Sequence, residues 1–595
     1  MEYKNRSDVP SEFKWDLSKM YQNGESIEKD INKVNELTPK ILEFKGHIMD
    51  SSNSLLEFLK LTEKQDRLIE KLYVYSKMSY DVDTKDNKTK ALKMKIEKLS
   101  EEIGEKYSFI EPEMLECDYD KVLKYIDEND DLKEYKFYLE CIFRYKSHSL
   151  SLSEEEIYTK AINSFGNCSE SFSSLNNADI YLGAIKDEKD KEIEVTSSNY
   201  GILMKSKDRR VRKDAFNAMY NYYEAHKNTL ASLYVGEIKE SSFITKVKKY
   251  NSSLERSLFS DNIDKKVYTN LIDTIHNNLD IMYDYMSVRK KMLGLDEMHM
   301  YDIYVDLVDQ KKDNIPFEEG KEILFDALKP LGEEYLKDLE RAFKEKWIDI
   351  YPSSGKRSGA YSWGCYDSYP YLLLNYNDTV DAVSTMAHEL GHSMHSYYSK
   401  SQNYVDSNYP IFLAEIASTV NEMLMNDYMY KNAKTKEEKI LFLTDFLDSV
   451  RTTIYRQTMF AEFEMIMHDK ESKGIPLTEE EISNTYYELN KLYYGDNVVS
   501  DDKIRYEWSR IPHFYTPFYV YKYATGLSSA LSIASRIING DKETKDSYLK
   551  FLSSGGNDYP LNILKRVGVD MTTPKPIEEA LEMFEDRLNE LKKLM

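Results

Sequence analysis

Cysteine is scarce in this chain of 595 residues, and the four that occur are far apart: Cys117, Cys141, Cys168 and Cys365. No two of them form a C-x-x-C pair, which argues against a disulfide framework and against a zinc site built from cysteines. Glycine and proline are also few, with 21 and 14 residues. Because both residues interrupt helices, their scarcity favours long helices and few hairpins.

Long apolar runs and basic clusters are missing as well. No run of about 18 apolar residues occurs, so we expect no transmembrane helix. Residues 1–8 contain no apolar segment of the kind found in secretory signals. The formal net charge is −23 and the short basic groups are mixed with acids, which argues against nucleic acid as a partner. We expect a cytoplasmic protein with no membrane or nucleic-acid partner, and the sequence leaves the oligomeric state open.

One short motif stands out, HELGH at residues 388–392. Positions i and i+4 of a helix share a face, so His388 and His392 can bind one metal ion, with Glu389 beside the open coordination position. Zinc held by two His and one carboxylate keeps a fourth position for water. A neighbouring Glu can take the proton of that water, which is the chemistry of a hydrolase. The alternative is a chance match on a solvated helix, at odds of about 1 in 100 for a chain of this size.

The residues before the motif predict the start of a helix. Apolar residues from Val380 onward have helical spacing, and residues 377–379 are of types favoured at an N-cap. Asp378 followed by Asp381 resembles a capping box. The motif is therefore expected one to two turns inside a helix, where both imidazoles share a face.

A zinc site needs a third ligand. His395 lies about 10 Å along the helix from His388, so we expect it to be a core or pocket-wall residue instead. Glu415 is 23 residues beyond His392 in the apolar segment FLAEIASTVNE, where a buried carboxylate needs a partner or a metal. Glu422 falls on the same face as Glu415 and can accept a hydrogen bond from a ligand imidazole. Surface exposure of Glu422 is the open alternative.

Residues 355–376 break the helical pattern. They are rich in Gly, Ser and Tyr, and residues 371–376 have the composition of a short strand. In a peptide hydrolase, an edge strand here offers backbone hydrogen bonds to an extended substrate, and a structural hairpin is the alternative. The candidate substrate-binding residues of this region are Gly355, Arg357, Gly359, Ala360 and Tyr361.

A histidine and four tyrosines gather in residues 511–523. A His ring and Tyr hydroxyls can donate hydrogen bonds to a developing oxyanion. Tyr515, Tyr519 and Tyr523 step by four, so they would share a helix face if a helix starts near Pro517. Most of the 49 tyrosines only pack, and the nearby His513 is what distinguishes this group.

Most of the remaining sequence has helical spacing, with clear cases at residues 92–107 and 267–293. The C-terminal segment predicts a helix with a buried stripe formed by Ile577, Leu581, Phe584, Leu588 and Leu591. A charged loop is expected at residues 186–192. We place a boundary after it, between an N-terminal helical region of residues 1–200 and a catalytic domain of residues 201–595.

Taken together, these segments resemble a known family. AHELGHSMHSYYS, FLAEIASTVNE, GAYSWGCYDSYPYLLLNY and IPHFYTPFYVYKYATG are similar to the oligoendopeptidase F branch of the thimet-oligopeptidase-like zinc metallopeptidases. The resemblance spans nearly the whole chain. It implies a mainly α fold, an elongated helical body split by a deep channel, with a small β element beside the zinc helix. Such a channel admits only short, unstructured peptides.

The resemblance also implies site roles. One zinc ion per chain would be held by His388, His392 and Glu415, with Glu389 as general base. His513 and a following Tyr would lie near the substrate carbonyl, Tyr519 first and then Tyr523, with Tyr515 and Tyr521 held in reserve as substrate-binding residues. Thimet-type relatives have a Gly-rich spacer after this His, which is absent here, so the choice of Tyr stays open.

The predicted function is therefore zinc-dependent cleavage of internal peptide bonds in oligopeptides. Two alternatives remain: a zinc carboxypeptidase on a similar helical scaffold, and a non-catalytic peptide-binding protein with structural zinc. Structural zinc sites are more often closed by four Cys or His ligands, and the sequence offers no such set.

Overall fold

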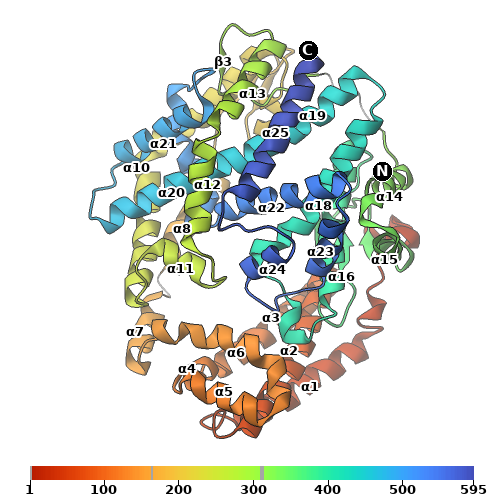
Figure 1. Ribbon diagram of the computed structural model, residues 1–595, viewed down its shortest axis with the longest axis vertical. Coiled ribbons are helices and arrows are strands. Elements are labelled where there is room, and N and C mark those ends of the chain that lie inside the picture. The colour runs from red at the N-terminus through yellow and green to blue at the C-terminus, as the bar shows by residue number, and fades with distance from the viewer. Residues whose placement is uncertain (1–2, 163–164, 309–313) are drawn as a thin grey trace. The chain divides into compact units, whose positions relative to one another are not determined.

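Helices account for most of the chain, and every strand is two or three residues long (Figure 1). The structure is a computed structural model that describes residues 3–162, 165–308 and 314–595. The predicted mainly α class is confirmed, whereas the expected deep channel stays a prediction. Within the described residues, we find no helix with both the length and the apolar content that a membrane span requires.

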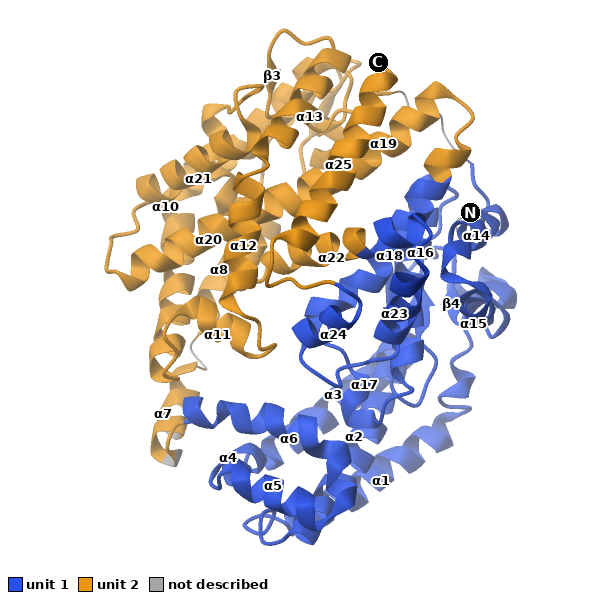
Figure 2. Cartoon of the chain, viewed as in Figure 1, with its two compact units in different colours: residues 1–149, 312–428, 533–568 blue, residues 150–311, 429–532, 569–595 orange. Residues whose placement is uncertain are grey.

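Two compact units make up the fold, and each joins three separate segments (Figure 2). Unit 1 comprises residues 1–149, 312–428 and 533–568, and unit 2 comprises residues 150–311, 429–532 and 569–595. This division follows spatial packing and not chain order. The contiguous division expected from the sequence, residues 1–200 and 201–595, stays a prediction.

Unit 1 contains the N-terminal helices and those around the HELGH motif. They are α1 (Gly24–Leu42), α2 (Ser52–Asp81), α3 (Asn87–Lys106), α4 (Ile110–Leu115), α5 (Tyr119–Glu128), α6 (Lys136–Phe143), α14 (Phe317–Ala327), α15 (Glu333–Lys344), α16 (Val380–Ser399), α17 (Tyr404–Ser407), α23 (Lys542–Leu552) and α24 (Pro560–Arg566). Two further helices, α18 (Ile411–Asn432) and α22 (Tyr521–Ile538), begin in one unit and end in the other. In the N-terminal core, Leu55, Phe58, Val122 and Leu139 are buried.

A three-stranded sheet belongs to unit 1 and has the order β4-β6-β5. Its strands are β4 (Ile348–Asp349), β5 (Tyr361–Trp363) and β6 (Tyr371–Leu373). β4 runs parallel to β6, and β5 runs antiparallel to it with Ser362 opposite Leu372. All three residues of the central strand β6 are fully buried. Of the strand expected in residues 371–376, only Tyr371–Leu373 is present, and β5 is an edge strand.

Unit 2 contains the remaining helices. They are α7 (Leu152–Ile162), α8 (Asn167–Asn177), α9 (Ser197–Met204), α10 (Arg209–Val247), α11 (Ser253–Phe259), α12 (Lys265–His276), α13 (Leu279–Met292), α19 (Lys436–Val450), α20 (Arg456–Ser472), α21 (Glu479–Tyr494), α25 (Lys575–Lys593) and the 3-10 helices η8 (Asp502–Arg510) and η9 (Pro512–Tyr515). Its strands form two pairs, β1 (Ala184–Lys186) with β2 (Glu192–Glu194), and β3 (Met298–His299) with β7 (Val498–Val499). The charged loop expected at residues 186–192 connects β1 to β2.

Two predictions about helices in unit 2 have opposite outcomes. In α25, the predicted apolar stripe is buried along its whole length, from Ile577 to Leu591. The single helix expected at residues 267–293 is wrong, because α12 ends at His276 and α13 begins at Leu279. Asn277 and Asn278 lie at the break, and asparagine side chains favour helix ends because they compete for backbone hydrogen bonds.

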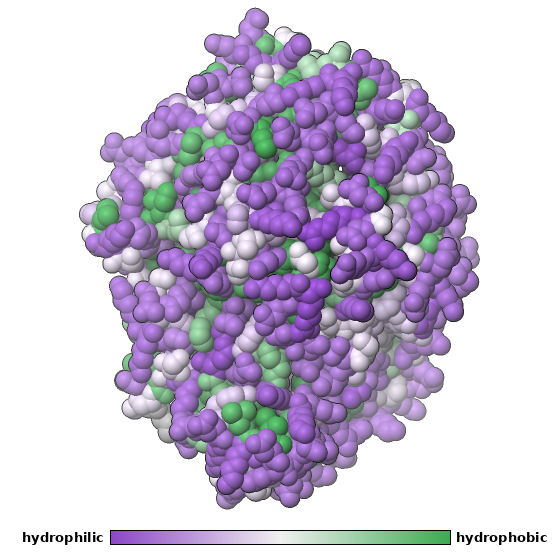
Figure 3. Space-filling view, viewed as in Figure 1, coloured by the Kyte–Doolittle hydropathy of each residue, from purple (hydrophilic) through white to green (hydrophobic). Residues whose placement is uncertain are grey.

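Hydrophilic side chains cover most of the face shown in Figure 3, with smaller apolar areas between them. This distribution agrees with a chain in which 31% of the residues are charged.

Candidate metal centre

The HELGH motif lies in the third and fourth turns of α16, somewhat deeper in the helix than the sequence indicated. This helix begins after Thr379, whose side-chain oxygen accepts a hydrogen bond from the N–H of Ala382 at 3.1 Å. The capping box expected from Asp378 and Asp381 is therefore wrong. Asp378 lies outside the helix with a left-handed φ of 61°, a conformation that Asp tolerates better than most residues.

Three potential ligand atoms converge beside this motif. The Nε2 atoms of His388 and His392 are 3.1 Å apart. Each lies 3.5 Å from Oε2 of Glu415, on α18. In the part of the chain that the structure describes, this is the one group of three or more His, Cys, Asp or Glu side chains close enough to hold a metal ion.

The geometry fits a tetrahedral zinc ion. With metal–ligand bonds of about 2.0–2.2 Å, the corners of the tetrahedron are about 3.3–3.6 Å apart. The observed separations of 3.1 and 3.5 Å are close to this range. Two imidazoles and one carboxylate leave a fourth position open, which is the donor set of a catalytic site.

Gly391 of the motif allows α18 to approach α16 closely. A Cβ atom at this position would lie 2.5 Å from Cα of Ser418. Because that neighbour is backbone, a side chain would force the helices apart. Asn421 adds a link by donating to the carbonyl of Ala387 at 3.1 Å. The close crossing brings Glu415, one turn before Ser418, to the two histidines. Sequence reasoning missed this contribution, although a glycine inside a helix is a signal of close packing.

Glu422 fixes the orientation of His388. Nδ1 of His388 is 2.8 Å from Oε1 of Glu422. A proton on Nδ1 that is donated to this carboxylate leaves the lone pair of Nε2 for a metal. Burial lowers the pKa of His388, but its hydrogen bond to Glu422 and the charges of Glu422, Glu389 and Glu415 outweigh burial and raise the pKa to about 9. The carboxylates thus favour a positive charge at this point.

Glu415 is less buried than the sequence indicated, since 42% of its side chain is exposed. What sets Glu415 apart from other acids is its closeness to the two imidazoles, and not its burial. Partial burial raises the pKa of Glu415, but the hydrogen bond from His392 and the charges of both histidines outweigh it and lower the pKa to about 2. The carboxylate is therefore ionised and ready to bind a cation.

Glu389 is buried, with 8% of the residue exposed. Burial raises its pKa, while the charges of His388 and His392 and a backbone hydrogen bond from Ser362 act in the opposite direction. A carboxylate with a raised pKa is better suited to accept a proton near neutral pH. Because Ser362 belongs to β5, and its Oγ lies 2.7 Å from Oγ of Ser393 on α16, the small β element lies beside the helix that carries the HELGH motif.

A cavity of about 430 Å³ adjoins the metal centre. His388, Glu389 and Glu422 line it from the helices. Gly359 and Ala360 line it from the segment before β5. These two are the predicted substrate-binding residues that the structure brings to the site.

The other three predicted residues of this segment are held against the region around α2. The side chains of Arg357 and Tyr361 lie 3.4 and 3.2 Å from Oδ2 of Asp81. The carbonyl of Gly355 accepts a hydrogen bond from the N–H of Thr84 at 2.8 Å. They therefore anchor the segment, and a direct substrate role for them stays a prediction.

His395 lies in the core, as expected from its distance along the helix. Its ring is fully buried and stacks on Tyr409 at a centroid distance of 3.6 Å. Burial lowers its pKa to about 3. Neither ring nitrogen has a hydrogen-bond partner among the described residues.

In unit 2, His513 forms a cluster with two of the predicted tyrosines. Its Nε2 atom is 3.2 Å from the hydroxyl of Tyr523, and its ring lies 6.1 Å from that of Tyr519. The helix expected from Pro517 is wrong, because α22 begins at Tyr521. A turn with a φ of 59° at Phe518 brings Tyr519 back towards His513 instead.

The turn at Phe518 is held by a buried acid. The N–H of Phe518 donates to Oε1 of Glu464 at 2.7 Å, and burial raises the pKa of Glu464 well above its usual value. Burial and the charge of Arg456 lower the pKa of His513, so its ring is neutral near pH 7. A neutral imidazole has one N–H to donate.

The two reserve tyrosines lie away from this cluster. Tyr515 stacks on Phe172 of α8 at 4.3 Å. Tyr521 is fully buried and packs on Tyr268 at 5.2 Å. The structure therefore does not bring Tyr515 or Tyr521 together with His513.

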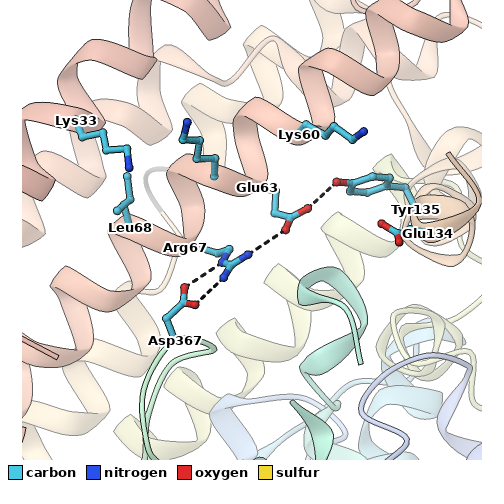
Figure 4. Close-up of a pocket in the computed structure, with 9 residues that line it drawn as sticks. Lys33, Lys60, Glu63, Arg67, Leu68, Glu134, Tyr135 and Asp367 are labelled. Carbon is cyan, nitrogen blue, oxygen red and sulfur yellow. Dashed lines mark hydrogen bonds and ion pairs between the residues drawn. The ribbon is translucent and has the colours of Figure 1, made fainter. Parts of the chain in front are cut away.

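A further cavity of unit 1, about 430 Å³ in volume, lies along α2 (Figure 4). Two of its acids, Glu63 and Asp367, pair with neighbouring groups. Arg67 binds Asp367 at 2.6 Å and lies 3.6 Å from Glu63, which accepts a hydrogen bond from Tyr135 at 2.6 Å. Because these charges satisfy one another, we assign no ligand to this cavity.

Comparison with protein-family models shows to which family the chain belongs. The model described as peptidase family M3 matches residues 202–583, and the model described as oligopeptidase F matches residues 113–181. The chain belongs to peptidase family M3. The prediction of a metalloendopeptidase is thereby confirmed at the level of the family.

Individual relatives of this M3 peptidase agree. Oligopeptidase PepF of Bacillus subtilis (strain 168) is 41% identical over 592 residues, which cover 99% of this chain and 88% of the relative. A crystal structure of a putative peptidase from Chlamydophila abortus is 39% identical, with a TM-score of 0.95 and full coverage of both chains. That of oligoendopeptidase-F from Enterococcus faecium is 35% identical, with a TM-score of 0.74, and covers 95% of this chain and 98% of its own. The resemblance to oligoendopeptidase F is confirmed.

Proposed function

We propose that this M3 peptidase is a zinc-dependent endopeptidase that cleaves internal bonds of short, unstructured oligopeptides. The observation that carries the proposal is the convergence of His388, His392 and Glu415 at tetrahedral spacing beside the buried Glu389. The names of its relatives, oligopeptidase and oligoendopeptidase, support the substrate class.

His388, His392 and Glu415 would hold one zinc ion per chain. When bound, zinc supplies Lewis-acid polarisation of the scissile carbonyl and lowers the pKa of water towards about 7. Glu422 keeps the ring of His388 oriented for this task through its 2.8 Å hydrogen bond. The proposed mechanism uses this one metal ion.

Glu389 acts as the general base. Its carboxylate takes the proton of the attacking water and then passes it to the leaving amine. Burial supports both steps, because the raised pKa of Glu389 brings it nearer to neutral pH and favours the transient protonated form.

His513 and Tyr519 stabilise the oxyanion. Both can donate a hydrogen bond to the charge that develops on the carbonyl oxygen. Tyr523 lies within hydrogen-bond reach of His513 at 3.2 Å, which orients the imidazole for that contact.

The substrate backbone lies along the segment before β5. Gly359 and Ala360 line the cavity beside Glu389, and β5 is one of the two edge strands of its sheet. An edge strand offers unpaired backbone groups to an extended peptide. Oligopeptides are thus the proposed partners, and the cytoplasm is the proposed location.

Cleavage of a ten-residue peptide blocked at both ends tests this proposal. Wild type, wild type with a zinc chelator, and Glu389→Ala are compared by mass spectrometry. We expect internal cuts by wild type, and a loss of about 10³-fold or more in Glu389→Ala, because general-base and electrostatic terms each supply factors of this order. Activity of the variant within tenfold of wild type would refute the role of Glu389. Absence of internal cuts by zinc-loaded wild type would favour an exopeptidase.

A further inference from the structure

A cavity of about 290 Å³ in unit 2 has an unbalanced charged lining. Residues of α9, α10, α20 and η8 form most of its wall. Among the described residues that line it, Lys205, Arg456 and Arg510 are cationic, and Glu507 is the one acid. A cavity with this lining favours an anion.

Arg456 and Arg510 share a single oxygen of Glu507. Nη2 of Arg456 donates to Oε1 at 2.6 Å, and Nη2 of Arg510 donates to the same atom at 3.3 Å. The other oxygen, Oε2, accepts a hydrogen bond from the hydroxyl of Tyr486 at 2.5 Å. A guanidinium that is fully paired with a carboxylate uses both oxygens. Neither arginine has that pairing here.

These groups are shielded from water. The side chain of Glu507 is 4% exposed, that of Arg456 15% and that of Arg510 24%. Nε of Arg510 is buried and has no hydrogen-bond partner among the described residues. A guanidinium carries five N–H donors, and a buried donor without an acceptor is unfavourable. A second carboxylate in the cavity would offset the excess positive charge of the two guanidinium groups.

The neighbouring ion pairs do not supply that carboxylate. Arg451, whose guanidinium lies 5.1 Å from the ring of Tyr304 in the cavity wall, donates to Asp448 at 2.9 Å. Asp448 also binds Arg289 at 3.0 Å. Asp448 and Glu507 therefore each serve two arginines. Asp306 lies 3.7 Å from Lys205 and offsets that charge, so the excess positive charge belongs to the arginines.

The rest of the wall is apolar. Tyr200, Phe216, Tyr220, Met204 and Met300 line it. The cavity is at the small end of the range for ligand sites, which is about 300–1,000 Å³. It is suited to one residue with an apolar side chain rather than to a long peptide.

The cavity neighbours His513. η8 carries Glu507 and Arg510 and ends three residues before His513. Arg456 is close enough for its charge to contribute, after burial, to lowering the pKa of His513. The two arginines and His513 therefore lie in the same part of unit 2.

We propose that this cavity is a carboxylate-binding site in which Arg456 and Arg510 hold the free C-terminal carboxylate of a peptide. The inference rests on the proposed peptidase function. The terminal side chain lies against the aromatic and methionine residues of the wall, so peptides are selected by their C-terminal end. A free small carboxylate such as acetate has the same chemistry, and the experiment separates the two sources.

Calorimetric binding to zinc-loaded Glu389→Ala tests the site without cleavage. Two peptides of one sequence are compared, one with a free C-terminal carboxylate and one with a C-terminal amide. We expect the acid to bind about ten- to hundred-fold more tightly, the range for hydrogen bonds to charged groups. Adding Arg510→Gln should abolish the difference, because Arg456 remains paired with Glu507 but the second donor is lost. Arg505→Gln, on the same 3-10 helix with 26% exposure, should preserve it.

Each result has one meaning. Equal binding of acid and amide, together with acetate binding that Arg510→Gln abolishes, would assign the site to a free carboxylate. Equal binding without acetate binding would overturn the proposal. Arg510→Lys, which keeps a cation, should retain part of the preference if Arg510→Gln fails to fold. Cleavage of the acid peptide by wild type is followed in parallel, and the absence of internal cuts would refute the proposed function and not the carboxylate site.

Discussion

Removing Glu422 should weaken zinc binding without removing a ligand. Its carboxylate lies 2.8 Å from Nδ1 of His388. Without this acceptor, the imidazole is free to rotate and to place its proton on Nε2, the atom that faces His392 and Glu415. Glu422→Ala therefore disturbs the metal site through the orientation of one ring.

The expected loss is about tenfold in zinc affinity, or about 1.4 kcal/mol. Partners of metal-binding histidines contribute about 10- to 100-fold. We expect the lower end because 29% of the Glu422 side chain is exposed, so solvent screens the interaction. Glu422→Gln keeps an acceptor oxygen but loses the charge, and its zinc affinity should fall by about threefold.

Competition with a chromophoric chelator at pH 7 measures these affinities. Glu334→Ala is the matched control, because Glu334 is exposed on α15 of the same unit and its removal changes the net charge equally. The control should bind zinc as wild type does. Zinc binding by Glu422→Ala within twofold of the control would refute the orienting role of Glu422.

Three other predictions follow from the geometry. Gly391→Ala should separate α16 from α18 at Ser418 and lower the free energy of unfolding by about 1–3 kcal/mol. Because the separation moves Glu415 away from the two histidines, zinc affinity should fall as well, and a variant with wild-type zinc affinity would contradict this. Tyr519→Phe should lower kcat by about 10²-fold with little change in KM, and a change confined to KM would assign Tyr519 to substrate binding. Since burial lowers the pKa of His395 to about 3, the unfolded chain takes up the proton first as pH falls below about 6.5. The contribution of His395 to the free energy of unfolding should then fall by about 2 kcal/mol between pH 7 and pH 5. In urea unfolding, His395→Phe, which keeps a ring against Tyr409, should lose that part of the pH dependence.

The candidate metal centre could be predicted from the sequence because the residues that indicate it are close together in the chain. His388 and His392 are one helical turn apart, and their spacing alone places both imidazoles on one face. Glu415 stood out as the acid of an apolar segment, although its side chain is 42% exposed. Its true distinction, the closeness of α18 to α16 at Gly391, depends on a contact between residues far apart in the chain.

Residues 511–523 show a case in which helical spacing predicts the wrong local structure. Tyr515, Tyr519 and Tyr523 have helical spacing, but the chain turns at Phe518 and α22 begins only at Tyr521. The buried carboxyl of Glu464 holds that turn. Since Glu464 is distant in sequence, no pattern within residues 511–523 could reveal the turn.

The carboxylate site was invisible for a similar reason. In the sequence, Glu507 and Arg510 are an acid and a base three residues apart, and this spacing carries no sign of a site. Only the fold adds Arg456 to the same oxygen atom and encloses the group in an apolar wall. An excess of buried charge is a property of packing and not of local sequence.

Titration of metal-free enzyme with zinc tests the central claim most directly. Cleavage of the blocked peptide and bound zinc are followed together in wild type and in Glu415→Ala. The account predicts that wild-type activity rises in step with zinc and levels off at one ion per chain, and that Glu415→Ala needs far more zinc to regain any activity. Full cleavage by the metal-free enzyme, or zinc binding by Glu415→Ala equal to that of wild type, would contradict it.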